Sequence, residues 1–235
     1  MVWLPPAELF ESETGLEAVF NVGAGVDGIL RNPALPDHVD IVRLEDSGLV
    51  AKIIEYVVHA IAEINRQMAD YRRANQERAW RPAAYTYPED WPVGVMGLGV
   101  IGRELAMALS RLAYPVAGWS RTLHDIDGVA RYAGDAGLDC FLQRTRLLIN
   151  VLPLTVATEN ILGRQTFSRL RRDSYVVNLG RGEHLDEQAL IEAIADGVLA
   201  GAVLDVFRSE PLPAEHPFWE FQPYGSRRTS PAPPT

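Results

Sequence analysis

Three glycines in "GLGVIG" have the spacing of a turn that holds phosphate. The motif with Gly97, Gly99 and Gly102 follows the apolar run "VGVM" and leads into a helical pattern over 101–112. The first glycine permits a tight turn, the second lets a pyrophosphate approach the backbone, and the third lets the helix pack on the strand. A purely structural turn is the alternative, but the position between strand and helix favours dinucleotide binding.

The motif "GWSR", at the end of the next predicted strand, indicates which dinucleotide binds. Enzymes that use NAD place Asp or Glu about 20 residues after the first glycines, where the carboxylate binds the ribose hydroxyls. Ser120 stands at that position here, and Arg121 follows it. A hydroxyl and a guanidinium can hold a 2′-phosphate, which a carboxylate would repel. We therefore predict that NADP(H) is preferred over NAD(H); the alternative is that Arg121 is a solvated loop cation.

Arg181 lies between two glycines in "VVNLGRG", directly after a buried strand pattern. A cation at the end of an apolar run is costly unless an anion compensates it. Ligands of parallel sheets bind at the carboxyl ends of the strands, so we expect Arg181 to meet a ligand anion there. An ion pair with Glu183 or Asp186 is the alternative.

The elements that must position these residues alternate between strand and helix from Val93 onward. Strand patterns occur in "VGVM", "YPVAGWS", "LLINVLP", "YVVNLG" and "AGAVLDVF", and helical patterns at 101–112, at about 159–170 and in "LDEQALIEAIADG". Asp186 is the expected N-cap of the last helix, and Gly197 its C-terminal stop. Apolar strands alternating with amphipathic helices predict an α/β fold with a doubly wound parallel sheet.

The part before Val93 has a different pattern. "LEAVFNVGAGVD" reads as a strand that ends in a glycine turn, and residues 48–77 show helical periodicity. The aromatic and proline-rich segment "WRPAAYTYPEDWP" ends that helix. We place the domain boundary near residue 88, with a partial substrate domain over 1–87, a cofactor domain over 88–221 and an aberrant or disordered tail over 222–235.

Composition narrows the class of protein. The 235 residues are 47% apolar with a formal net charge of −9, which argues against nucleic acid or an anionic membrane as a partner. No apolar run approaches a membrane span, and the first residues do not resemble a signal peptide. Cys140 is the only cysteine and the five histidines are scattered, so we expect neither a disulfide nor a metal site. These features predict a reduced cytoplasmic globular protein.

Taken together, the glycine motif, "VVNLGRG" and "AVLDVFRSEPL" resemble the D-2-hydroxyacid dehydrogenase family. Within it the likeness is greatest to the A-type glyoxylate/hydroxypyruvate reductases. Further supporting stretches are "VWLPP", "VFNVGAGVDGIL", "EYVVHA", "WPVGVMGLG", "LPLTVAT" and "EPLPAEHPFW". The resemblance runs from Val2 to about Trp219, and it implies reduction of a small 2-oxo acid.

The resemblance also implies roles for individual residues. Arg181 would grip the carboxylate and carbonyl of the 2-oxo acid, and Glu210 would pair with a histidine that protonates the carbonyl oxygen. Positions that would line the cofactor, besides the three glycines, Ser120 and Arg121, are Val100, Ile101, Thr158, Leu179, Gly180 and Asp205. Ala24 and Gly25 would hold the substrate carboxylate through backbone amides, and Trp3 would lie on an active-site loop. Glu210 could instead be a turn residue, and Asp205 a cap.

The sequence departs from the family's pattern at both ends. The family's first strand and helix should precede "VWLPP", and a "TPH" motif should place the catalytic histidine near Thr229. No histidine follows His216, and the sequence ends in "EFQPYGSRRTSPAPPT". A shifted reading frame or a truncated gene would explain this tail, and a natural disordered tail is the alternative.

Three interpretations of function follow from these observations. The first is NADPH-dependent reduction of glyoxylate or hydroxypyruvate, impaired by loss of the histidine. The second is an inactive cofactor-binding fragment or pseudoenzyme. The third is a phosphoglycerate- or lactate-type dehydrogenase, against which "GWSR" and "EPLPAEHPFW" weigh. The family resemblance also implies a homodimer that pairs through the cofactor domain and the long helix.

Overall fold

The structure is a computed structural model that describes residues 5–13, 15–21, 25–43 and 48–219. It divides into two compact units, Met1–Lys52 and Ile53–Thr235, which are described separately below.

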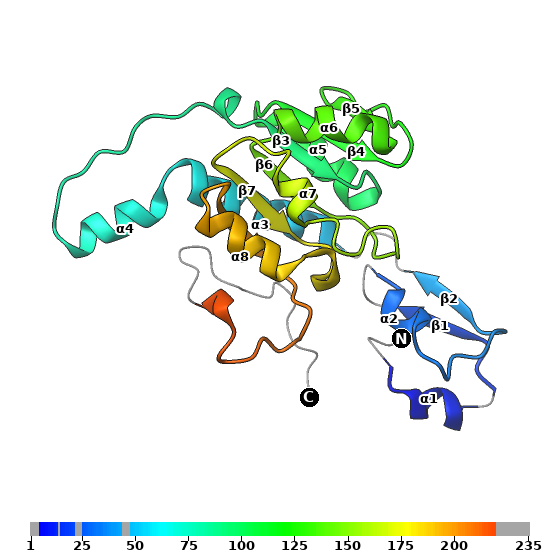
Figure 1. The fold of residues 1–235 in the computed structure, drawn as a ribbon. Coiled ribbons are helices and arrows are strands. Elements are labelled where there is room, and N and C mark those ends of the chain that lie inside the picture. Colours follow the sequence, from blue (N-terminus) through cyan, green and yellow to red (C-terminus); the bar gives the residue numbers. More distant parts are fainter. Residues whose placement is uncertain (1–4, 14, 22–24, 44–47, 220–235) are drawn as a thin grey trace. The chain divides into compact units, whose positions relative to one another are not determined.

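The second unit is built on a sheet of six parallel strands (Figure 1). The strands are β3 (Val93–Met96), β4 (Val116–Ser120), β5 (Ala130–Ala133), β6 (Leu147–Asn150), β7 (Ser174–Asn178) and β8 (Leu199–Leu204). Their order across the sheet is β5-β4-β3-β6-β7-β8, so the chain first runs outward from β3 and then returns to the centre at β6. This order confirms the predicted doubly wound fold, and it creates a switch point between β3 and β6.

Helices cover both faces of this sheet, as the apolar strands require. They are α3 (Leu49–Asn65), α5 (Val100–Arg111), α6 (Gly134–Arg144), α7 (Arg164–Phe167) and α8 (Glu187–Ala195). The helix α4 (Met68–Gln76), which follows α3, extends away from the sheet (Figure 1). One core cluster combines α3 and α5 with strand residues such as Val95 and Val177. A second cluster combines α6, α7 and α8 with strand residues such as Met96 and Val176. Neighbouring strand residues point to opposite faces, which is why every strand except the edge strand β5 contributes to both clusters.

The helical segment expected over 48–77 is two helices rather than one. Gln67 adopts a left-handed backbone conformation with φ of 52°, which ends the hydrogen-bonded ladder between α3 and α4. Val57, Ile61 and Ile64 in α3 are buried as the periodicity predicts. Met68 and Tyr71, beyond the break, are 38% and 42% exposed and do not continue that buried face.

Two other segments differ from the pattern in the sequence. The helix expected at about 159–170 is only the single turn α7, because Asn160 is left-handed with φ of 54° and Leu162 forms a parallel bridge with Leu185. The elements β5 and α6 had no counterpart in the sequence reading. The strand β5 lies at the edge of the sheet with two exposed and two partly buried residues, so it lacks the apolar signal of the other strands.

The first unit contains two parallel strands, β1 (Ala18–Asn21) and β2 (Asp40–Arg43). The helices α1 (Ala7–Ser12) and α2 (Asp27–Leu30) accompany them. A small core of Phe10, Val19, Ile29 and Val39 holds the unit together. The strand predicted within 16–27 is β1.

The position of the long helix bears on how the chain is divided. From Ile53 onward, α3 belongs to the unit that contains the sheet, because its apolar face is buried against β3, β6 and β7. The boundary near residue 88 between a substrate domain and a cofactor domain stays a prediction from the sequence. None of the helices in the described part of the chain has the length and apolar composition needed to cross a membrane.

Candidate functional site

The sequence-predicted residues of the second unit gather at the ends of its strands. Gly97 follows β3, Arg121 follows β4, and Asp205 follows β8. Leu179, Gly180 and Arg181 follow β7 in the same way. Because all six strands are parallel, these residues share the carboxyl edge of the sheet.

The first and third glycines of the motif are required by the protein's own packing. Gly97 has φ of +99°, and a Cβ there would lie 3.0 Å from the backbone of Val151, just after β6. A Cβ on Gly102 would collide with the carbonyl oxygen of Gly97. The tight turn therefore sits at the switch point, with α5 packed directly on it.

Gly99 is different, because nothing in the described structure requires a glycine there. Its φ of −69° is ordinary for any residue, and a Cβ would meet no atom within 4 Å. It is the N-cap of α5, and no side chain of the described residues caps the helix. Val100 is 54% exposed and Ile101 is partly buried, so the first amides of α5 border open space. This opening fits a pyrophosphate, which helix N-termini bind through free N–H groups and the helix dipole.

Ser120 and Arg121 form the polar end of β4. The Ser120 side chain is buried, and its Oγ donates to the carbonyl of Thr122 at 2.6 Å. Ser120 thus shapes the turn in which the next residue stands. Arg121 is exposed and forms no ion pair with an acidic side chain of the described chain. An exposed guanidinium on a shaped turn is suited to a phosphate ligand.

Two buried asparagines, which the sequence reading did not single out, join the loops after β6 and β7. Asn150 Nδ2 donates to Asn178 Oδ1 at 2.9 Å, and both side chains are fully buried. Asn178 Nδ2 donates to the carbonyl of Arg181 at 2.9 Å. The feature of the sequence that could have indicated this contact is an asparagine at the end of each of two apolar strand patterns. These bonds fix the backbone that carries Arg181.

His184 is a second support for Arg181. It ends a 3₁₀ turn over Gly182–His184 and is completely buried. Its Nδ1 accepts from the Arg181 backbone N–H at 2.9 Å. A Cβ on Gly180 would lie 2.6 Å from the same Nδ1, so this glycine makes room for the ring. Burial and hydrogen bonding thus fix Arg181 at its base.

The loop after β8 packs against the same turn. A Cβ on Gly182 would collide with the Phe207 carbonyl, so a glycine is needed where the two loops meet. Arg208 Nε donates to the carbonyl of Leu185 at 2.9 Å and reinforces this contact. Glu210 is exposed, and its Oε1 accepts from the Phe207 backbone N–H at 3.0 Å. The structure therefore brings the Arg181 turn and the loop from Asp205 to Glu210 together.

The remaining predicted positions are not part of this convergence. Thr158 is partly buried, and its Oγ1 donates to the carbonyl of Pro153 at 2.8 Å, which closes the turn after β6. Gly25 belongs to the first unit, where its carbonyl accepts from Asn21 Nδ2 at 3.0 Å. Trp3 and Ala24 lie outside the described residues.

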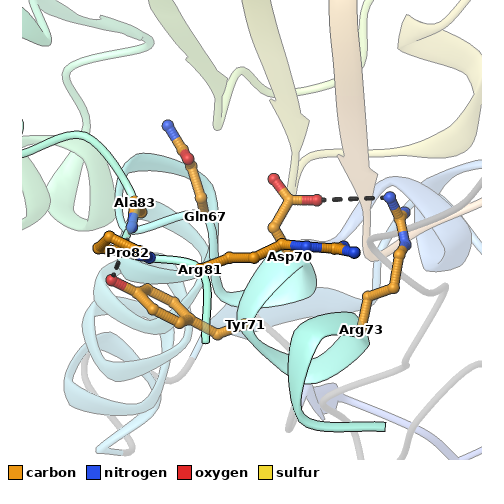
Figure 2. Close-up of a pocket in the computed structure, with 7 residues that line it drawn as sticks. All are labelled: Gln67, Asp70, Tyr71, Arg73, Arg81, Pro82 and Ala83. Carbon is orange, nitrogen blue, oxygen red and sulfur yellow. Dashed lines mark hydrogen bonds and ion pairs between the residues drawn. The ribbon is translucent and has the colours of Figure 1, made fainter. Parts of the chain in front are cut away.

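A shallow pocket of about 300 Å³ lies elsewhere in the unit, beside α4 (Figure 2). Its charged side chains are already paired: Arg73 with Asp70 at 3.6 Å, and Arg81 with Glu77 at 2.6 Å. We assign it no part of the site at the sheet edge. No cluster of three or more metal-binding side chains occurs among the described residues.

The sequence of this chain matches a known protein family. Residues 58–224 match the NAD binding domain of the D-isomer specific 2-hydroxyacid dehydrogenases. The glyoxylate/hydroxypyruvate reductase A of Yersinia enterocolitica is 43% identical over 224 residues, which are 93% of this chain and 72% of that protein. The reductase of the same name from an Enterobacter species is 41% identical, with the same coverage.

Solved structures give the same result. An NADPH-dependent glyoxylate/hydroxypyruvate reductase from Sinorhizobium meliloti, in complex with NADP and sulfate, superposes with a TM-score of 0.89 at 39% identity. The match covers 94% of this chain and 71% of that one. A D-isomer specific 2-hydroxyacid dehydrogenase from Xanthobacter autotrophicus, in complex with NADPH and MES, superposes with a TM-score of 0.87 at 35% identity, covering 94% of this chain and 70% of that one.

Proposed function

Because this chain belongs to the D-isomer specific 2-hydroxyacid dehydrogenases, an oxidoreductase family, we propose that it serves NADPH-dependent reduction of a small 2-oxo acid, glyoxylate or hydroxypyruvate. One observation carries the proposal. At the carboxyl edge of the sheet, the glycine turn opens toward a ligand and Arg181 is held by Asn178 and His184.

The cofactor would lie along that edge. The open space at Gly99 and the first amides of α5 would receive the pyrophosphate, and Arg121 with Ser120 would receive the 2′-phosphate. Val100 and Ile101 would contribute backbone near the phosphates, and NADPH would supply the hydride. Solved relatives that contain NADP or NADPH support this choice of cofactor.

The nicotinamide end would be bound by the loops after β6, β7 and β8. Asp205 would accept a hydrogen bond from the carboxamide, with Leu179 and Gly180 beside it. Thr158 would act through the turn that its hydroxyl closes. In these roles the residues would hold the hydride donor beside Arg181, which is the geometry that the reaction needs.

Arg181 would bind the substrate. Its planar guanidinium can donate two parallel hydrogen bonds to the carboxylate and carbonyl oxygens of a 2-oxo acid. The same contact stabilises the negative charge that develops on the carbonyl oxygen as hydride arrives. The backbone of Ala24 and Gly25, and the side chain of Trp3, would contact the substrate in the way that the family resemblance implies.

Glu210 would orient the group that delivers the proton. The resemblance places a histidine near residue 229 for this task, and this sequence has Thr229 there and no histidine after His216. A positioned general acid contributes about 10²–10⁴-fold to such a step. We therefore expect a polypeptide of these 235 residues to bind NADPH but to reduce the 2-oxo acid slowly. A polypeptide that binds NADPH and shows no turnover at all is the alternative.

We further propose a homodimer formed through the segment that follows α4. Trp80 is 96% exposed, Tyr85 is 73% exposed and Tyr87 is 54% exposed. Large aromatic side chains gathered on one extended segment are typical of protein interfaces. A second copy of the chain is the partner that the family resemblance favours.

Two measurements test the proposed function. Fluorescence titration of the 235-residue polypeptide should give a lower Kd for NADPH than for NADH at equal salt. Oxidation of NADPH by glyoxylate should be slow with this polypeptide. It should rise by about 10²–10⁴-fold in a chimaera that carries a family-like N-terminal unit and a "TPH" C-terminal segment.

Arg181→Ala in that chimaera should abolish turnover and leave the Kd for NADPH unchanged. Full turnover by the unaltered 235 residues would show that another group donates the proton. Equal affinity for NADH and NADPH would contradict the proposed preference for NADP(H).

A further inference from the structure

One side chain of the loop after β8 reaches the loops that follow β6 and β7. Arg208 Nε donates to the carbonyl of Leu185 at 2.9 Å, and Arg208 Nη2 donates to the carbonyl of Glu183 at 3.1 Å. The same Nη2 also donates to the side-chain oxygen Oδ1 of Asn160. Because these nitrogens belong to one planar guanidinium, a single rigid group joins three loops. The proposed function assigns this residue no role.

The segment that Arg208 holds is the turn directly after Arg181. Three successive carbonyls of that turn accept hydrogen bonds from outside it, those of Glu183, His184 and Leu185. The first two accept from the backbone N–H groups of Asn160 and Leu162, each at 2.9 Å. The third belongs to a residue that is only 2% exposed, and it accepts from Arg208. A buried carbonyl is costly to leave without a partner, so Arg208 stabilises this conformation of the turn.

Arg208 is itself fixed on the loop that carries Glu210. The residue before it, Phe207, lies against the Arg181 turn at Gly182, where a Cβ would collide with the Phe207 carbonyl. The Phe207 N–H donates to Glu210 Oε1 at 3.0 Å. The Glu210 carboxylate and the turn after Arg181 are therefore joined through two adjacent residues, Phe207 and Arg208.

The contact depends on the shape of the guanidinium more than on its charge. Its acceptors are two backbone carbonyls and one side-chain amide, all neutral. No acidic side chain in the described part of the chain forms an ion pair with Arg208. Two donors at a fixed spacing are what the acceptors require, and lysine, which has the same charge, offers a single nitrogen.

We propose that Arg208 is a positioning residue that keeps the Arg181 turn and the Glu210 loop in one fixed arrangement, so that the nicotinamide end of the cofactor and the 2-oxo acid meet a preformed site. This inference rests on the proposed function. The loops that Arg208 joins include the residues proposed for that end of the cofactor and for the substrate, which are Leu179, Gly180, Arg181 and Asp205. The glycine turn and Arg121, proposed for the pyrophosphate and the 2′-phosphate, lie on other loops. Loss of Arg208 should thus affect one end of the cofactor only.

A pair of ligands distinguishes this role from a general effect on folding. NADPH carries the nicotinamide, whereas 2′-phospho-ADP-ribose has the same 2′-phosphate and pyrophosphate without it. The full 235-residue chain and its Arg208→Met variant would be titrated with both ligands. We expect Arg208→Met to raise the Kd for NADPH by about three- to tenfold, the usual effect of a lost hydrogen bond, and to leave the Kd for 2′-phospho-ADP-ribose unchanged.

Amide hydrogen exchange of the chain without ligand tests the hydrogen bonds of Arg208 directly. In Arg208→Met, the amides of residues 181–186 should exchange about three- to tenfold faster, because opening of the turn no longer breaks the bonds to the guanidinium. The amides of β3 and β4 should exchange as they do in the unaltered chain.

Two further variants are controls. Arg208→Lys keeps the positive charge but has one nitrogen in place of two spaced donors, so it should weaken NADPH binding as Arg208→Met does. Arg164→Ala removes a different arginine contact, the ion pair with Glu192 that joins α7 to α8, and it should change neither Kd.

The possible results lead to separate conclusions. An unchanged Kd for NADPH in Arg208→Met, an equal loss for both ligands, or full affinity in Arg208→Lys would overturn the role of Arg208 and leave the proposed function standing. Unchanged exchange of residues 181–186 would do the same. Failure of the unaltered chain to bind either ligand would overturn the proposed function, and the positioning role of Arg208 with it.

Discussion

The glycines at the candidate site are required for different reasons, which depend on the backbone φ and on the atoms that surround each one. A Cβ on Gly102 or Gly182 would collide with a backbone carbonyl, and Gly97 has a left-handed φ. Gly99 has an ordinary φ and open space around it. The first three are explained by the folded chain alone, whereas Gly99 is explained only by something that approaches from outside. Gly99 is thus the residue that most directly indicates a ligand.

Arg121 gives the sharpest prediction at the scale of one residue. Its guanidinium is exposed and free of acidic partners among the described residues, so it can form a charge-assisted contact with a 2′-phosphate. Arg121→Ala should weaken NADPH binding by about 1–3 kcal/mol and change NADH binding little, because NADH lacks that phosphate. Titration of both cofactors at one salt concentration measures the difference. Arg111→Ala, an exposed arginine at the far end of α5, is the control, and equal losses for the two cofactors would contradict the role of Arg121.

At the scale of elements, helix ends decide what the site can bind. The N-terminus of α5 lies at the carboxyl edge without a side-chain cap, where it is open to a ligand. By contrast, the N-terminus of α8 is closed by its own sequence, since Asp186 Oδ1 accepts from the Ala189 N–H at 3.0 Å. Two helices of one sheet thus satisfy their first amides differently, and the uncapped end of α5 agrees with the pyrophosphate site proposed there.

An ion pair between α3 and α4 gives a prediction about pH. Glu63 accepts from both terminal nitrogens of Arg72, at 2.9 and 2.5 Å. The hydrogen bond from Arg72 lowers the pKa of Glu63, which is partly opposed by burial. A carboxyl whose folded-state pKa is lowered stabilises the fold above its unfolded pKa of about 4.3, and that contribution is lost as the pH falls.

Glu63→Gln should therefore lower the free energy of unfolding at pH 7 by about 0.2–1 kcal/mol, the range for pairs near the surface. The difference from the unaltered chain should disappear at a pH of about 3. Urea unfolding at both pH values measures it. Glu55→Gln, an exposed acid on the same helix outside any ion pair of the described residues, is the control, and a loss at low pH as large as at pH 7 would exclude the ion pair as its cause.

At the scale of the whole molecule, the exposed aromatic segment after α4 predicts association. Burying Trp80 against a second copy would remove a large apolar surface from water. Trp80→Ser should shift the chain from dimer toward monomer, with little effect on the Kd for NADPH because the segment lies outside the sheet edge. Sedimentation velocity over a range of concentrations measures the state. Val156→Ser, also at a 96% exposed position, is the control; a dimer unaffected by Trp80→Ser would place the interface elsewhere.

The sequence by itself determined five of the six strands of the sheet, because its signals are local. A continuous apolar run of four or five residues predicts a buried parallel strand, and glycines at fixed spacing predict the turn after β3. The same holds for the N-cap at Asp186 and the stop at Gly197, which has φ of 65°. Placing Arg121, Arg181 and Asp205 at one edge followed from the rule that parallel strands end together.

Only the tertiary structure decided what holds those residues in place. Asn150 and Asn178 are 28 positions apart, and nothing local predicts that their side chains bond to each other. The buried ring of His184 beneath Gly180, and the contact of Gly182 with Phe207, likewise depend on loops from different strands meeting. The sequence did not predict the break at Gln67 or the edge strand β5. The spacing of hydrophobic residues indicates which positions are buried, and neither of these segments is deeply buried.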